Sequence, residues 1–285
     1  MLRRGLLGCG LAAALGGCSA ADLLNATVSD RDVSETKDIR YAPGERHTLD
    51  VYRPLSRGGA VPMIVFIYGG GWNSGAKETY DFVARPLVRR GFVVVVPDYR
   101  LYPQVRFPAF LEDNATAVAW AFAHARELGA DPGRVVLVGH SAGAFDVAML
   151  ALDPAWLAAV GIDRGRLAGA VGLAGPYRFL PSSDPDVAPI FGADNTPAHE
   201  PYAFADGKGP PMLLAAGTED TIVQPRNTTE LAERLRARGG SVTAKLYPGV
   251  GHVGLITAFA PVFQGRAPVL DDVAAFAAGV RAPGV

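Results

Sequence analysis

Three side chains of this sequence are of the types that together make a hydroxyl group nucleophilic. Ser141 lies in the pentapeptide Gly139-His-Ser-Ala-Gly143, and Asp220 and His252 follow it in that order. A serine hydroxyl is a poor nucleophile at neutral pH, so it needs a base such as histidine to take its proton. The histidine needs a carboxylate that holds its tautomer and stabilises the imidazolium. The three residues therefore predict nucleophilic catalysis through Ser141.

The surroundings of Ser141 favour a tight turn between a strand and a helix. Residues 134–138 are mostly β-branched and aliphatic, and residues 144–150 read as a helix. A G-x-S-x-G sequence in that setting is typical of a nucleophile elbow, a strained turn that exposes the serine hydroxyl. Its two glycines suit the turn because a side chain there would collide with the neighbouring strand or helix.

The base and the acid have to be chosen among several candidates. His252 lies in a Gly-flanked loop after the last predicted strand, so we expect it to be the base. The other histidines are His47, expected at the surface of an early strand; His124, within a helix; His140, expected to point away from Ser141; and His199, in a variable loop. Asp220 is the expected acid, with the adjacent Glu219 as the alternative, whereas Asp98 and Asp113 are expected to have structural roles.

A glycine-rich loop, Gly69-Gly-Gly-Trp-Asn-Ser-Gly75, follows a buried apolar run at residues 62–68. A P-loop requires Gly-Lys-Ser/Thr, and here Gly75 is followed by Ala-Lys-Glu. A dinucleotide fingerprint requires a third glycine or alanine where Ser74 stands. The pattern fits an oxyanion loop, because glycines let bare backbone N–H groups converge on a small anionic oxygen.

Strands and helices alternate along most of the chain. Strands are predicted at residues 38–41, 47–52, 62–68, 92–97, 134–138, 167–174, 211–216 and 242–247, and helices at 78–90, 109–128, 144–150, 224–238 and 269–279. This order predicts an α/β fold with a mostly parallel central sheet and helices on both faces. Active sites of such sheets lie beyond the carboxyl ends of the strands. The glycine loop, Ser141, Asp220 and His252 all follow predicted strands, which favours one shared site.

Residues 175–209 are irregular and proline-rich. A loop of this length is usually a lid or a binding segment, and the alternative is an ordinary surface excursion that packs on its own aromatic residues. We expect a modest apolar substrate pocket formed by Trp72, Tyr177 and Tyr202.

The N-terminus indicates secretion. Residues 1–17 combine a short basic start with an apolar run too short to span a bilayer, as in a signal peptide. The sequence Leu15-Gly-Gly-Cys18 resembles the lipobox of bacterial lipoproteins, which implies lipidation of Cys18; the alternative is a plain signal peptide with an incidental cysteine. Residues 18–37 then read as a tether and residues 38–285 as the folded domain. The expected location is the bacterial cell envelope, with a periplasmic catalytic domain held to a membrane.

Composition narrows the remaining possibilities. The 285 residues suffice for one large domain. The net charge of -1 lacks the excess of positive charge that favours binding to nucleic acid. The only two cysteines are Cys9 and Cys18, so no structural disulfide or cysteine-based metal site is expected in the mature protein. Nothing in the sequence determines the oligomeric state.

From about residue 46 to residue 260 the chain resembles bacterial α/β-hydrolase esterases, in particular the hormone-sensitive-lipase-like carboxylesterases and the kynurenine-formamidase-like branch. The matching segments are Leu49-Asp-Val-Tyr-Arg-Pro54, Gly69 to Gly75, Asp98-Tyr-Arg-Leu101, Gly139 to Gly143, Gly217 to Asp220 and Gly251-His252. The resemblance implies oxyanion donors on the backbone of Gly70, Gly71 and Ala142, with Trp72 as a substitute for one glycine, and no metal or organic cofactor. Tyr68 departs from it, because the residue before the glycines is usually a histidine that braces the loop.

These observations predict a serine carboxylic ester hydrolase for small-molecule esters with short-to-medium acyl groups. A formamidase-type amidase would use the same residues. A lipid-anchored binding protein that kept the fold and lost turnover is a third hypothesis.

Overall fold

The computed structural model describes residues 20–55 and 58–283. The predicted signal peptide, residues 1–17, and Cys18 lie outside the described residues. Within the described ranges, no helix combines the length and apolar character needed to cross a membrane.

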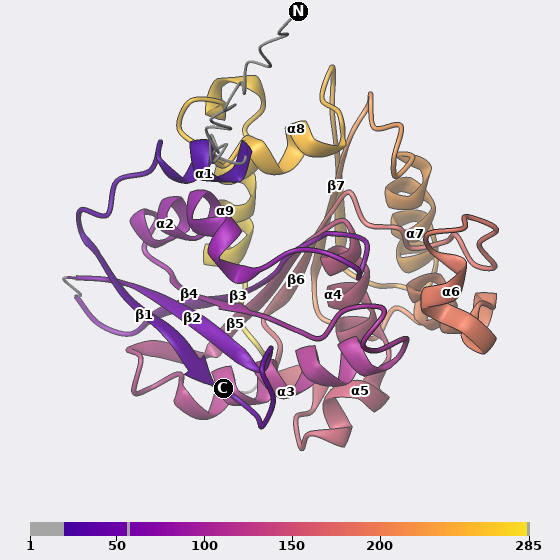
Figure 1. Cartoon of the computed structure of the whole chain (residues 1–285), viewed down its shortest axis with the longest axis horizontal. Helices are drawn as coiled ribbons and strands as arrows, with labels where there is room; N and C mark the ends of the chain where they lie inside the picture. The colour runs from indigo at the N-terminus through magenta and orange to yellow at the C-terminus, as the bar shows by residue number, and fades with distance from the viewer. Residues whose placement is uncertain (1–19, 56–57, 284–285) are drawn as a thin grey trace, which may run out of the picture.

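The centre of the molecule is an eight-stranded sheet in the order β1-β2-β4-β3-β5-β6-β7-β8 (Figure 1). The β1–β2 and β2–β4 pairs are antiparallel, and the five other neighbouring pairs are parallel. The strands are β1 (Val33–Arg40), β2 (Thr48–Pro54), β3 (Val61–Ile67), β4 (Val93–Pro97), β5 (Ala130–His140), β6 (Gly169–Leu173), β7 (Met212–Gly217) and β8 (Val242–Tyr247). The predicted mostly parallel α/β sheet is confirmed.

Helices cover both faces of the sheet. Figure 1 shows α2 and α9 on one side of the strands and α3, α4 and α5 on the other. The helices are α1 (Ala20–Asn25), α2 (Asp81–Arg89), α3 (Ala109–His124), α4 (Ala142–Leu152), α5 (Pro154–Ala159), α6 (Ala188–Phe191), α7 (Arg226–Ala237), α8 (His252–Thr257) and α9 (Val269–Gly279). Short 3-10 segments are η1 (Lys77–Tyr80), η2 (Arg164–Arg166), η3 (Gly192–Asp194), η4 (Pro197–His199), η5 (Pro201–Phe204) and η6 (Gln264–Arg266).

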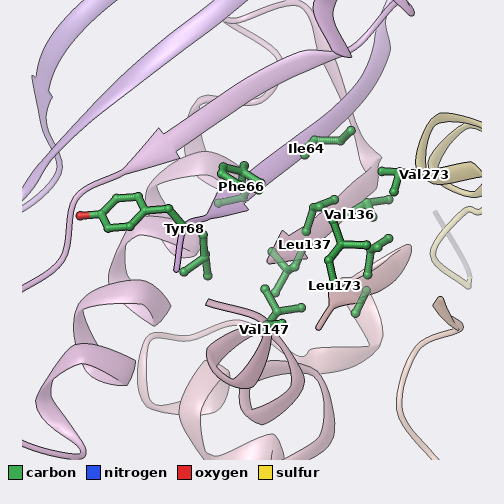
Figure 2. Packing of buried hydrophobic residues seen from close by; sticks show 14 of the residues in the cluster. Ile64, Phe66, Tyr68, Val136, Leu137, Val147, Leu173 and Val273 are labelled. Carbon is green, nitrogen blue, oxygen red and sulfur yellow. The ribbon is translucent and has the colours of Figure 1, made fainter. Parts of the chain in front are cut away.

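The core lies between the sheet and these two helical layers. Successive side chains of a strand point to opposite faces, and Figure 2 shows Leu137 on the side of Val147 in α4 and Val136 on the side of Val273 in α9. All four side chains are fully buried. Every residue of α4 is buried as well, as expected for a helix whose residues other than Asp146 are all apolar or glycine. The helix that follows Ser141 is therefore held firmly against the sheet.

The strand register brings the ends of the central strands together. Ile67 at the end of β3 pairs with Gly139 of β5, and His140 pairs with Leu173 of β6. At the other end of the parallel region, Gly217 of β7 pairs with Tyr247 of β8. The loops that leave these strands consequently emerge at one edge of the sheet.

Residues 20–37 do not form the expected tether. Residues 20–25 form α1 and residues 33–40 form β1, so the folded domain begins before residue 38. Asn25 ties α1 to the domain: its Nδ2 donates to Glu78 O at 2.8 Å, and its Oδ1 accepts from Phe82 N at 3.0 Å. The prediction was wrong because β1 is an edge strand. Such strands carry charged side chains that blunt the unpaired edge, so their sequences read as polar linkers.

Candidate active site

The elbow at Ser141 is held by close backbone contacts. Ser141 has backbone angles φ of 55° and ψ of -121°, a strained conformation that its surroundings must stabilise. Its N–H donates to Leu173 O at 2.9 Å, and its carbonyl accepts from Ala144 N at 2.9 Å. A side chain at position 143 would not fit, because a Cβ on Gly143 would lie 2.1 Å from Ile67 O. The elbow therefore depends on the glycine that its sequence pattern contains.

The three residues predicted to act together form one hydrogen-bonded chain. His252 Nε2 lies 2.9 Å from Ser141 Oγ, and His252 Nδ1 lies 2.8 Å from Asp220 Oδ2. The other oxygen of Asp220 accepts from Ile222 N at 3.0 Å and Val223 N at 2.8 Å. These backbone donors hold the carboxylate in place. A serine, a histidine and a carboxylate in this geometry can transfer a proton from the hydroxyl to the imidazole.

The structure separates the alternatives for acid and base. Glu219 is exposed, whereas Asp220 is 4% exposed and contacts His252. His252 begins α8 instead of lying in an open loop. His140 packs its ring 4.9 Å from that of His252, and its Nε2 lies 3.3 Å from His252 O. Burial, and secondarily the neighbouring His252, lower the pKa of His140 to about 3. His140 therefore stays neutral and supports the backbone of His252.

The remaining polar candidates have structural partners. Asp113 receives two hydrogen bonds from Arg100 Nε and Nη2, at 2.8 and 2.6 Å. The expectation that His47 lies at the surface was wrong, because its side chain is 12% exposed and its Nε2 lies 3.0 Å from Asp113 Oδ1. Asp113 comes from α3, far along the chain, so the early strand alone did not reveal this partner. Among the described residues, no group of three or more His, Cys, Asp or Glu side chains is arranged to hold a metal ion.

The glycine-rich loop leaves β3 beside the elbow. The backbone angles φ of Gly70, Gly71 and Trp72 are 128°, 58° and 59°. Glycine adopts such positive values readily, whereas tryptophan does so rarely. The loop is closed by Ser74 N, which donates to Gly70 O at 3.0 Å. Gly71 and Ala142 line the same pocket as Ser141.

Tyr68 braces this loop in place of the usual histidine. Its hydroxyl donates to Asp98 Oδ1 at 2.5 Å and accepts from Arg46 Nη2 at 2.8 Å. The same Asp98 oxygen accepts from Lys77 N at 2.9 Å, and Arg46 Nη2 donates to Gly75 O at 2.9 Å. Burial raises the pKa of Tyr68 well above its usual range, so the hydroxyl remains a donor. The tyrosine therefore connects the end of the loop to two charged residues.

Replacement of Tyr68 by phenylalanine is expected to lower the free energy of unfolding by about 1.5–3 kcal/mol, because a buried hydrogen bond to Asp98 and a partly buried one from Arg46 are lost. Turnover should fall as well, since Gly75 would lose part of its support. Urea unfolding measures the first effect and a steady-state assay the second. Tyr202→Phe is the matched control. It also removes a tyrosine hydroxyl, but it keeps the ring that contacts Arg178 and Arg234. Equal stability of wild type and Tyr68→Phe would contradict the bracing role.

Trp72 is fixed by a buried carboxyl group that the sequence reasoning missed. Its Nε1 donates to Asp146 Oδ1 at 3.0 Å, and Asn114 Nδ2 donates to Asp146 Oδ2 at 3.0 Å. Asp146 is 0% exposed, and burial raises its pKa to about 8. An aspartate in the middle of an otherwise apolar helix was the available signal, because buried carboxyl groups need hydrogen-bonding partners.

Asp146→Asn is expected to stabilise the protein, and increasingly so as the pH rises from about 4 to about 8. Across this interval folded Asp146 keeps a proton that the unfolded chain releases, so wild-type stability falls with rising pH. Asparagine does not titrate, and its amide can donate to Asn114 Oδ1 once the Asn114 side-chain amide turns over, since Asn114 Nδ2 is the atom that faces position 146 and Oδ1 has no hydrogen-bond partner among the described residues. Melting temperatures at pH 5 and pH 8 test this expectation. The titration of His140 changes the stability of wild type and variant equally, so it cancels when the two melting temperatures are subtracted. If that difference in melting temperature is the same at pH 5 and pH 8, Asp146 is not protonated in the folded protein.

A pocket of about 400 Å³ opens on one side of Ser141. Trp72 lines it, as predicted, and the segment after β6 contributes Pro176, Arg178 and Phe179. All three lie in the 175–209 segment that was predicted as a lid or binding segment, although Tyr177 and Tyr202 were the residues expected to form the pocket there. The position of Pro176, Arg178 and Phe179 directly after a strand, shared with Ser141 and Asp220, is the signal that distinguishes them within the segment.

The predicted pocket positions of Tyr177 and Tyr202 were wrong. Tyr177 is 0% exposed, and a Cβ placed on Gly172 would lie 1.9 Å from its hydroxyl oxygen. Its ring therefore packs against β6 instead of facing the pocket. Tyr202 lies between Arg178 and Arg234, whose guanidinium carbons are 4.7 and 4.6 Å from its ring centroid. Hydrogen bonds hold the backbone of the 175–209 loop at both residues, from Tyr177 N to Asn227 Oδ1 at 3.0 Å and from Tyr202 N to Tyr177 O at 3.1 Å.

Sheet order and site together define the class of protein. The nucleophile follows β5, the carboxylate follows β7 and the histidine follows β8, all at the carboxyl edge of a mostly parallel sheet. That is the arrangement of the α/β-hydrolase fold. This chain has the α/β-hydrolase fold.

Comparisons with known proteins agree with this class. Residues 49–156 match the BD-FAE family model, and residues 187–267 match the model of the prolyl oligopeptidase family. Esterase LipC of Mycobacterium tuberculosis is 29% identical over 236 residues, which cover 75% of this chain and 58% of that protein. A probable isoprenylcysteine alpha-carbonyl methylesterase of Arabidopsis thaliana is 25% identical over 242 residues, covering 77% and 51%. The chain thus spans between half and two thirds of the length of these relatives.

Solved structures share the fold over most of both chains. An esterase of Pyrobaculum calidifontis is 26% identical with a TM-score of 0.72, covering 90% of this chain and 89% of that one. Esterase B of Lactobacillus rhamnosis is 22% identical with a TM-score of 0.75, covering 90% of each chain.

Proposed function

We propose that the protein is a serine carboxylic ester hydrolase that acts on small esters with short-to-medium acyl groups. The observation that carries the proposal is the continuous chain from Ser141 Oγ through His252 to Asp220, with contacts of 2.9 and 2.8 Å. Ser141, at one end of this row of hydrogen bonds, lines a pocket of about 400 Å³, which suits a small substrate. The relatives named as esterases support the same reaction class.

In the first half of the reaction, Ser141 Oγ attacks the ester carbonyl carbon while His252 Nε2 takes the hydroxyl proton. Asp220 holds His252 in the required tautomer and stabilises its positive charge. The carbonyl oxygen becomes an oxyanion, which we assign to the backbone N–H groups of Gly70, Gly71 and Ala142. The C–O bond then breaks, and His252 returns the proton to the leaving alcohol oxygen.

In the second half, water hydrolyses the acyl-serine. His252 Nε2 takes a proton from the water as its oxygen attacks the acyl carbon, and a second oxyanion forms at the same donors. When the C–Oγ bond breaks, the proton passes to Ser141 Oγ and the carboxylic acid leaves. His252 Nε2 therefore accepts and returns the proton in both halves of the cycle.

The proposal is tested by comparing p-nitrophenyl acetate and butyrate with an N-formyl aromatic amide. We expect turnover of both esters and a much lower kcat/KM for the amide. A preference for the amide would favour the formamidase-type alternative. Absence of turnover together with absence of labelling by a fluorophosphonate would favour a binding protein that has lost catalysis.

We propose further that Cys18 carries a lipid that holds the domain on a membrane of the bacterial envelope. The lipobox-like sequence before it supports this assignment. Cys18 precedes α1 by two positions, a span of at most about 7 Å, so the domain would sit close to the membrane surface. Wild type expressed in a bacterium should partition into a detergent phase, and Cys18→Ser should not. Cys9→Ser is the matched control, and equal partitioning of wild type and Cys18→Ser would contradict the anchor.

A further inference from the structure

A second cleft, of about 350 Å³, lies on the other side of the nucleophile. Ser141 and Gly71 line both this cleft and the 400 Å³ pocket. An ester bound with its carbonyl carbon at Ser141 has two halves that point in different directions, so the two cavities can receive one half each. We call the second cavity the α1 cleft, because Ala21 and Leu24 of α1 form one of its walls.

The α1 cleft is apolar. Its large contributors are Leu24, Tyr80, Phe82, Val253 and Ile256, and within the described part of the chain no Asp, Glu, Lys or Arg lines it. Its titratable side chains besides His252 are His140 and Tyr80. Burial keeps both neutral, since it lowers the pKa of His140 to about 3 and raises that of Tyr80 to about 12. The pocket on the other side is different, because Arg178, Asp184 and Arg226 line it.

The wall formed by α1 is well anchored. Asn25 makes two hydrogen bonds to the segment that carries the opposite lining residues, to Glu78 O and from Phe82 N. Leu24 is partly buried and packs against the core, whereas its neighbour Leu23 is 61% exposed. In Figure 1, α1 lies beside α8, which carries Val253 and Ile256. Leu24 therefore narrows the cleft while Leu23 faces solvent.

The position of His252 decides which half of the ester occupies the α1 cleft. His252 lines this cleft and is not among the residues that line the other pocket. The histidine must hand its proton to the leaving alcohol oxygen, so the alcohol half has to lie on the histidine's side. On the basis of the proposed ester hydrolysis, we infer that the α1 cleft binds an apolar alcohol moiety of the substrate and that Leu24 sets its length.

Acetate esters of methanol, ethanol, butanol and hexanol test this inference, with hydrolysis followed by acid release. Wild-type kcat/KM should rise with the alcohol chain length, because each added methylene finds an apolar wall. Leu24→Trp should lower the hexyl-to-methyl ratio of kcat/KM by about tenfold or more, the scale on which pockets discriminate by size. Leu23→Trp, one position along the same helix, should keep the wild-type ratio. A ratio unaffected by Leu24→Trp would overturn the inference.

Two further measurements keep the outcome unambiguous. Thr257→Trp narrows the cleft from α8 and should lower the same ratio, which decides the matter if Leu24→Trp does not fold. Methyl esters of acetic, butyric and hexanoic acid probe the other half, and a loss confined to this series would show that the two halves are exchanged. A wild-type rate independent of alcohol length would also refute the inference. If wild type hydrolyses no ester and Ser141 takes no fluorophosphonate, the proposed function itself fails.

Discussion

Ser141→Ala is expected to reduce kcat by about 10⁴-fold or more, because the reaction loses its nucleophile and the covalent intermediate with it. Removal of the hydroxyl leaves Asp220 and His252 in contact with each other, since their 2.8 Å contact does not involve Ser141. The fold should persist, because the elbow is held by backbone bonds such as Ser141 N to Leu173 O at 2.9 Å. Turnover of p-nitrophenyl acetate measures the loss.

A fluorophosphonate label separates loss of the nucleophile from loss of structure. Wild type should be labelled at Ser141, and Ser141→Ala should remain unlabelled while keeping its melting temperature. Ser34→Ala is the control, because Ser34 lies in β1 at the opposite edge of the sheet from β7 and β8. Substantial labelling or turnover of Ser141→Ala would show that another residue is the nucleophile.

Asp220→Asn is expected to cost about 10⁴-fold in kcat, the scale known for an acid-to-amide change in a serine triad. The amide cannot stabilise the imidazolium and favours the wrong histidine tautomer. Geometry should change little, because the side-chain oxygen can still accept from Ile222 N and Val223 N, now 3.0 and 2.8 Å away. A pH–rate profile and kcat at its plateau measure the effect.

Glu219→Gln is the matched control for that variant. The two carboxylates are adjacent in sequence, but Glu219 is exposed and Asp220 is the one in contact with His252. Glu219→Gln should change kcat by less than a few-fold. Near-normal turnover of Asp220→Asn together with a large loss in Glu219→Gln would reverse the assignment of the acid.

Several elements followed directly from local sequence patterns. The run at residues 242–247 was predicted as a strand and forms β8, and residues 269–279 were predicted as a helix and form α9. Such elements depend on the period of their apolar residues, which the chain carries locally. The elbow at Ser141 has a local signature as well, its two flanking glycines, although the atom that excludes a side chain at Gly143 is Ile67 O of β3.

The errors concern residues whose neighbours are distant in sequence. Tyr177 and Tyr202 were expected in the pocket on the basis of residue type, but the path of the 175–209 loop turned one into the core and the other between two arginines. His47 was expected at the surface, and its partner Asp113 lies in α3. Residues 20–37 were expected to be a tether, and their partners are β2 and the segment around Phe82. Chain topology alone decides such contacts.

By itself the sequence determined the α/β fold class, the order of strands and helices, and the placement of Ser141, Asp220 and His252 after strands that end at one edge. These depend on residue periodicity and on turns a few residues long. Only the tertiary structure decided which carboxylate reaches His252, how Tyr68 and Asp146 hold the glycine loop, and that α1 forms a wall of a second cleft. Each of these requires an angstrom-scale approach of side chains from separate elements, and pairwise packing between elements is not encoded in any single stretch of the chain.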